Sequence, residues 1–99
     1  MKIASLSDFK SSLSGSEPPE ELSFCGKALW WAGNGNWDKS QDLIQDGNDL
    51  SSVRIHAYLH RLEGDLSNAQ YWYTKAGTFM QAIPLEKEWE DLVVPFILE

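Results

Sequence analysis

The sequence of 99 residues has a single cysteine, Cys25, and few basic side chains. One cysteine cannot form an internal disulfide or a thiolate metal site, and its simplest role is that of a small buried apolar side chain. Eight lysine and arginine residues against fifteen acidic residues give a net charge of −7. This charge repels phosphate backbones and anionic membrane surfaces, so we expect neither nucleic acid nor a membrane as a partner.

Long apolar segments are also missing. No stretch approaches the ~20 apolar residues of a membrane span, and the first residues lack the apolar core and cleavage site of a signal peptide. Together with the lone cysteine, these absences predict a cytoplasmic protein. Only four prolines and a hydrophobic content of 42% are typical of a folded chain. The length predicts a single domain over residues 1–99 with one core.

Hydrophobic periodicity and chain breakers predict an all-α fold, a compact bundle of about five to six helices. The expected helices cover residues 5–13, 19–33, 37–46, 66–76 and 85–97, with one more that ends near residue 63. We expect Ser51 or Ser52 to cap the helix that ends near residue 63. Pro95 is expected to kink or end the last helix, because proline cannot donate the backbone hydrogen bond of a helix interior.

The last expected helix, over residues 85–97, is strongly amphipathic. Its apolar residues recur at i, i+4, i+7 and i+11 and are Leu85, Trp89, Leu92 and Phe96. The opposite face is acidic and carries Glu86, Glu90 and Asp91. A stripe with a tryptophan and a phenylalanine is strongly stabilised by burial, so we expect this helix to dock on the others as a C-terminal cap.

Two segments of the chain are related by a constant offset of 29 residues. Residues 28–40 align with residues 57–69, so that Gly35 matches Gly64 and Ser40 matches Ala69. The alignment predicts two helix-turn-helix units, over about 20–46 and 51–77, each with a glycine in its turn. A small residue at position 40 or 69 would allow the two helices of a unit to approach closely.

This pattern of a helix, a Gly-Asn or Gly-Asp pair, a bulky residue and then a small residue resembles the turn of the tetratricopeptide repeat. Repeats of that family have a period of ~34 residues and usually need about three units. The resemblance implies two degenerate units closed by flanking helices. The run HAYLHRLEGDLSNAQYWYTKAG at residues 56–77 also resembles small bacterial proteins without an assigned function. That second resemblance implies a bacterial origin and identifies no catalytic residue.

Two histidines, His56 and His60, have the i, i+4 spacing with which one helix face can hold a metal ion. A metal- or ligand-binding protein or an enzyme centred on this pair, with help from Glu63 or Asp65, is therefore one hypothesis. The alternative favoured by the sequence is a pair of hydrogen-bonded packing histidines, because no further ligand motif accompanies them. In that case Asp65 caps the next helix, Glu63 is solvated, and we expect neither a cofactor nor a metal.

Aromatic residues are the other unusual feature, since five tryptophans and three tyrosines occur in 99 residues. Most fall on the expected inward faces. We expect Tyr71 to lie with Asn68 and Lys75 on an outer face, and Trp30 to lie at a polar edge of its helix. Exposed aromatic residues beside polar groups suit partner contacts. The leading hypothesis is thus a non-catalytic, helical-repeat-like interaction module that binds a protein partner or itself.

Overall fold

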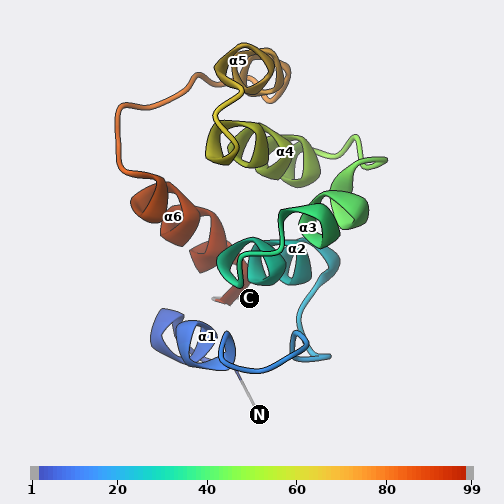
Figure 1. Ribbon diagram of the computed structural model, residues 1–99, viewed down its shortest axis with the longest axis vertical. Helices are drawn as coiled ribbons and strands as arrows, with labels where there is room; N and C mark the ends of the chain where they lie inside the picture. The colour runs from blue at the N-terminus through green and yellow to red at the C-terminus, as the bar shows by residue number, and fades with distance from the viewer. Residues whose placement is uncertain (1–2, 98–99) are drawn as a thin grey trace.

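The computed structural model describes residues 3–97, which form six helices and no strand (Figure 1). The helices are α1 (Leu6–Ser12), α2 (Phe24–Gly33), α3 (Trp37–Ile44), α4 (Leu50–Leu62), α5 (Leu66–Lys75) and α6 (Leu85–Ile97). Helices α1 and α5 lie at opposite ends of the molecule, and α6 runs along one side between them. The prediction of an all-α, small helical bundle is confirmed.

The turns of the two helical hairpins, α2–α3 and α4–α5, have the same backbone conformation. Gly35 and Gly64 have φ angles of 90° and 86°, in the left-handed region that glycine adopts without a steric cost. One residue later, side-chain oxygens of Asn36 and Asp65 accept hydrogen bonds from backbone N–H groups and cap α3 and α5. The predicted turn glycines and the predicted cap Asp65 are therefore confirmed, and Asn36 is the corresponding cap in the first hairpin.

Two predicted helix starts are wrong. Helix α2 begins at Phe24 rather than near residue 19, because the side chain of Ser23 accepts a hydrogen bond from the backbone N–H of Gly26 and caps the helix there. Helix α4 is capped by Asp49 and not by a serine. The Asp49 carboxylate accepts the backbone N–H of Ser52 at 3.1 Å, whereas Ser52 itself is buried and cannot act as the exposed cap.

Helix α6 continues through Pro95 to Ile97, so of the two expected effects of Pro95, a kink or an end, the end does not occur there. The missing N–H of Pro95 would have bonded to the carbonyl of Asp91, and both residues are exposed. Water can therefore satisfy the carbonyl that the proline leaves free. Docking of the apolar face compensates for the lost hydrogen bond.

The main core forms where α6 covers α2. The indole of Trp89 is buried, and its N–H donates to the carbonyl of Leu29 at 2.9 Å. Its ring also meets Phe9 of α1 edge to face, with ring centroids 5.6 Å apart. A Cβ atom at Gly33 would come within 2.6 Å of this indole. The apolar stripe of α6 is thus a core element, and Gly33 gives it room.

A smaller core cluster joins α4 to α5 through the buried side chains of Ala57, Ala69 and Tyr73. At the position in α3 that the sequence aligns with Ala69, the buried hydroxyl of Ser40 donates to the carbonyl of Ala28 in α2 at 2.6 Å. Both small residues lie completely buried between the helices of their hairpin. The predicted close approach at these two positions is confirmed.

Candidate functional site

The outer side of α5 carries the sequence-predicted partner residues that are exposed. Tyr71 is 60% exposed, and Asn68 and Lys75 are also exposed. Helix α5 packs mainly on α4 and lies at one end of the molecule (Figure 1), so no other helix of the described chain, residues 3–97, covers its outer side. A shallow hollow of about 550 Å³ opens there. We call this the α5 surface; its lining residues are Ser67, Gln70, Tyr71, Thr74 and Lys75.

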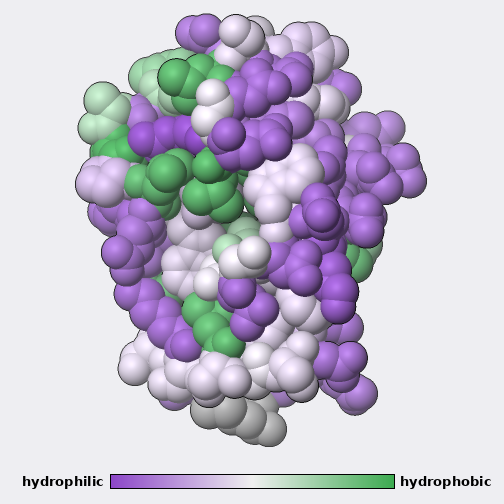
Figure 2. All heavy atoms as spheres, viewed as in Figure 1, coloured by the Kyte–Doolittle hydropathy of each residue, from purple (hydrophilic) through white to green (hydrophobic). Residues whose placement is uncertain are grey.

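Two further large apolar side chains are exposed at the start of α5 and in the loop that follows it. Leu66 at the start of α5 is 55% exposed, and Phe79 in the following loop is 73% exposed. Figure 2 shows hydrophobic atoms gathered on the face that the α5–α6 loop crosses. Five large hydrophobic residues are exposed among residues 3–97, and three of them, Leu66, Tyr71 and Phe79, lie on α5 or just after it. Such concentration at one end is typical of a contact surface.

The aromatic side chains behind this surface contact one another. The ring of Trp72 stacks on His56 with centroids 4.0 Å apart, and the Lys75 ammonium lies 4.7 Å from the Trp72 ring. Tyr71 meets Trp72 edge to face at 5.3 Å. A side chain already held by its neighbours loses little rotamer entropy on binding, so Tyr71 is suited to act as an anchor.

Trp30, the other predicted partner residue, does not lie on the surface. Its side chain is 0% exposed, and its indole N–H donates to the hydroxyl of Ser12 in α1 at 3.0 Å. It also meets Trp31 edge to face. The prediction is wrong because it treated one side of α2 as open, whereas α1 contributes a partner on that side. Trp30 is a core residue.

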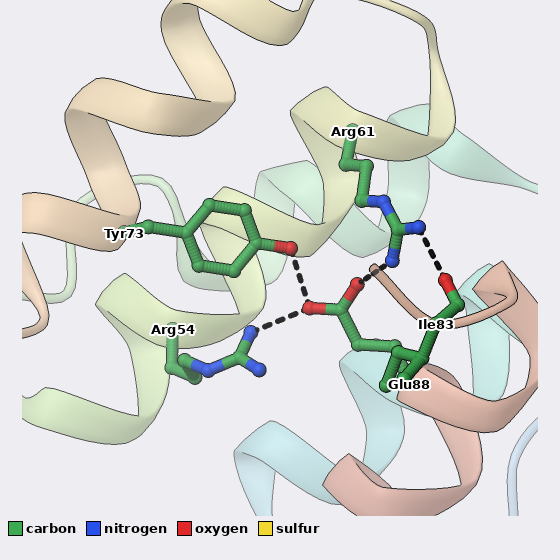
Figure 3. Close-up of polar contacts among 5 residues, drawn as sticks. All are labelled: Arg54, Arg61, Tyr73, Ile83 and Glu88. Atoms are coloured by element: carbon green, nitrogen blue, oxygen red, sulfur yellow. Dashed lines mark hydrogen bonds and ion pairs between the residues drawn. The ribbon is translucent and has the colours of Figure 1, made fainter. Parts of the chain in front are cut away.

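A buried polar network links α6 to α4 and α5 (Figure 3). The carboxylate of Glu88 is 2% exposed. Arg54 donates to one of its oxygens at 2.7 Å, Arg61 donates to the other at 2.6 Å, and the hydroxyl of Tyr73 donates to the first. Arg61 also donates to the carbonyl of Ile83. The network therefore ties both the start of α6 and the loop before it to α4.

Sequence reasoning missed Glu88, although a local signal exists. Glu88 follows Leu85 by three residues and precedes Leu92 by four, so it lies within the apolar stripe rather than on the acidic face. A carboxylate at such a position requires a buried partner. Arg54 and Arg61 lie seven residues apart, on one face of α4. Which basic residues the carboxylate meets depends on tertiary packing and not on a local pattern.

The side chains of this network form hydrogen bonds and ion pairs with one another, which indicates a structural role. Burial raises the pKa of Tyr73, and its hydrogen bond to Glu88 raises it further. Burial likewise raises the pKa of Tyr58 to about 12. Both hydroxyls thus remain protonated at neutral pH and act as hydrogen-bond donors or packing groups. Neither is a general base.

Cys25 is buried in the first turn of α2, as predicted. Burial raises the pKa of its thiol, and the nearest polar partner is the hydroxyl of Ser52 at 3.8 Å. Since the thiolate is the reactive form of cysteine, this environment does not activate Cys25 as a nucleophile.

The two predicted histidines have different surroundings. His56 is buried between Trp72 and His60, whose ring centroids lie 4.0 Å and 4.9 Å from its own. Burial lowers the pKa of His56, so at neutral pH it is an uncharged ring packed between two others. His60 instead places Nδ1 2.8 Å from a carboxylate oxygen of Glu63. Asp65 lies close to both, so the ligand-type side chains gather around His60 and not around the His56–His60 pair.

No family model matches the chain, and no curated protein or solved structure matches it significantly. Among the residues that the structure describes, no helix combines the length and the apolar character needed to cross a membrane. The site must therefore be interpreted from its own residues.

Proposed function

We propose that the protein is a cytoplasmic, non-catalytic, helical-repeat-like module that binds a partner protein through the α5 surface. The observation that carries this proposal is the concentration of exposed large apolar side chains, Leu66, Tyr71 and Phe79, at the uncovered end of the molecule. Tyrosine flanked by polar groups is among the residue types that contribute most to binding at protein interfaces.

The arrangement of the hairpins supports the same proposal. In the tetratricopeptide-like arrangement that the sequence resembles, a further helix would pack on the outer side of α5. Here the chain turns away after Gly77, and α6 packs on α2 and α4 instead. The α5 surface is thus the side of the two packed hairpins on which a helix of another protein fits.

Charge favours a partner other than a second copy. Each chain carries a net charge of −7, and this charge opposes the approach of two copies. The residues lining the α5 hollow include one charged side chain, Lys75, and no carboxylate. A mainly uncharged patch on an acidic protein suits a partner with a neutral contact surface and basic residues around it.

The test is capture of partners from a lysate of the source organism by wild-type protein and by two variants. Tyr71→Ala removes the anchor from the α5 surface. Phe24→Ala is the matched control, because Phe24 is an exposed aromatic of similar exposure, 52%, at the start of α2. We expect the same protein band with wild type and with Phe24→Ala, and binding weakened about tenfold or more with Tyr71→Ala.

Thermal melts of both variants must match the wild type, which both exposed positions predict. Loss of the band with Phe24→Ala but not with Tyr71→Ala would contradict the proposal and move the contact surface to the start of α2. Light scattering that shows a stable dimer, disrupted by Tyr71→Ala, would identify the occupant as a second copy and overturn the choice of partner.

A further inference from the structure

Three side chains with metal-ligand atoms meet at the turn between α4 and α5. They come from the last turn of α4 (His60), its C-cap (Glu63) and the N-cap of α5 (Asp65). One ligand atom from each lies within 4.8 Å of the others. Bonds of about 2.0 to 2.2 Å in the tetrahedral geometry typical of zinc place two ligand atoms roughly 3.4 Å apart. Closing a coordination shell around an ion therefore requires the two carboxylates to move inward by rotation about their side-chain bonds.

We propose that His60, Glu63 and Asp65 form a binding site for a divalent transition-metal ion of the zinc class. One imidazole nitrogen and two carboxylate oxygens are a borderline donor set. Calcium and magnesium prefer oxygen-only shells, and copper(I) prefers sulfur ligands. Three protein ligands leave at least one coordination position for water or for a group from another molecule.

The backbone and neighbouring rings hold the three side chains in place. The left-handed Gly64 closes the turn, and the N–H of Asp65 donates to the carbonyl of His60 at 2.9 Å. The ring of His60 lies between His56, stacked at 4.9 Å, and Trp37, which meets it at 6.2 Å. Fixed orientation of a histidine ring is a regular feature of metal sites.

The carboxylates are also suited to binding. The Asp65 carboxylate accepts hydrogen bonds from the side-chain amide and the backbone N–H of Asn68. Asn68 therefore orients it. Glu63 lines a hollow of about 520 Å³ with Trp37 and Leu62. An ion can therefore reach the Glu63 carboxylate from solvent.

The inference differs from a site on the two histidines, because it excludes His56. His56 packs against Trp72 and is buried, whereas Glu63 is exposed and Asp65 half-buried. Within residues 3–97 this cluster is the one place where three histidine, cysteine or acidic side chains gather closely enough to share an ion. The proposed metal site does not depend on the proposed binding of a partner at the α5 surface, and each proposal has its own test.

The experiment is calorimetric titration of the full-length protein with zinc chloride in a neutral buffer free of chelators. We expect one equivalent to bind to the wild type and no binding to His60→Gln. Glu63→Gln and Asp65→Asn should weaken binding by about tenfold or more, since even outer-shell partners contribute about 10-fold to 100-fold. Asparagine is itself a good N-cap, so Asp65→Asn keeps α5 intact and separates metal binding from folding.

His56→Phe is the control, because phenylalanine preserves stacking on Trp72 and lacks ligand atoms. It should bind zinc like the wild type, with an unchanged far-ultraviolet circular dichroism spectrum. Nickel should quench part of the total tryptophan fluorescence, through Trp37 beside His60, in the wild type and in His56→Phe but not in His60→Gln. No binding to wild-type protein, unchanged binding to His60→Gln, or loss of binding in a folded His56→Phe variant would each overturn the inference.

Discussion

Arg61 of α4 places Nη1 2.6 Å from Oε1 of Glu88 in α6, joining residues 27 positions apart in the chain. The Glu88 carboxylate also accepts hydrogen bonds from Arg54 and Tyr73, so this one group bonds to three side chains from two helices. This contact fixes α6 across α4. The stability of the bundle should therefore depend on the charge of Glu88.

Replacing Glu88 by glutamine should lower the free energy of unfolding by about 3 kcal/mol. This is the low end of the cost of breaking a buried ion pair, because Arg54 and Arg61 retain some contact with water. Urea denaturation measures the change. Glu86→Gln is the control, since Glu86 is exposed on the same helix. Equal midpoints for the two variants would show that the network contributes no net stability.

Gly33→Ala should destabilise the protein although alanine favours helices. A Cβ atom at position 33 would lie 2.6 Å from the Trp89 ring, and such overpacking costs about 1 to 3 kcal/mol. That cost exceeds the gain in helix propensity, which is at most about 1 kcal/mol. Thermal unfolding followed by tryptophan fluorescence tests this. A higher melting temperature would mean that α6 does not approach α2 so closely.

Ala69→Leu should destabilise the protein by about 1 to 3 kcal/mol, because Ala69 is completely buried between α4 and α5 beside Ala57 and Tyr73. Ser67→Leu on the exposed side of α5 adds a similar volume without a clash and provides the comparison. Chemical denaturation of both variants is the measurement. If Ala69→Leu melted like the wild type, the α4–α5 contact would be looser than described.

The local features of the fold could be predicted, because each depends on neighbouring residues. Gly35 and Gly64 follow from the need for positive φ in the turns, and Asn36 and Asp65 from the free N–H groups that follow them. The burial of Trp89 follows from helical periodicity. These predictions need no knowledge of which helices are neighbours.

The features that depend on packing between distant segments could not be predicted. Trp30 lies near a polar edge on a helical wheel, yet Ser12 of α1 lies over it. Glu88 meets its partners at separations of 15 to 34 residues. At the proposed metal site, the i, i+4 spacing pointed to the pair His56 and His60, whereas packing stacks His56 on Trp72 and brings Glu63 and Asp65 close to His60.

A chain ending at Ile83 lacks α6 and should aggregate or melt at a much lower temperature than the full-length protein. The truncation exposes the surface that buries Trp89 and leaves Arg54 and Arg61 without their carboxylate. Burial of a large aromatic side chain contributes about 1.5 to 3 kcal/mol. Size-exclusion chromatography and a thermal melt measure the effect. A monomeric truncated chain with an unchanged melt would show that α6 is a detachable segment.

The most direct measurement of partner binding at the α5 surface is photo-crosslinking in living cells of the source organism. A photoreactive phenylalanine analogue replaces Tyr71 in one variant and Phe24 in the other, since both side chains are exposed aromatics on different helices. Light should produce a discrete covalent adduct with another protein from position 71 and none from position 24. An adduct from position 24 alone, or no adduct from position 71, would contradict the assignment of the α5 surface as the partner site.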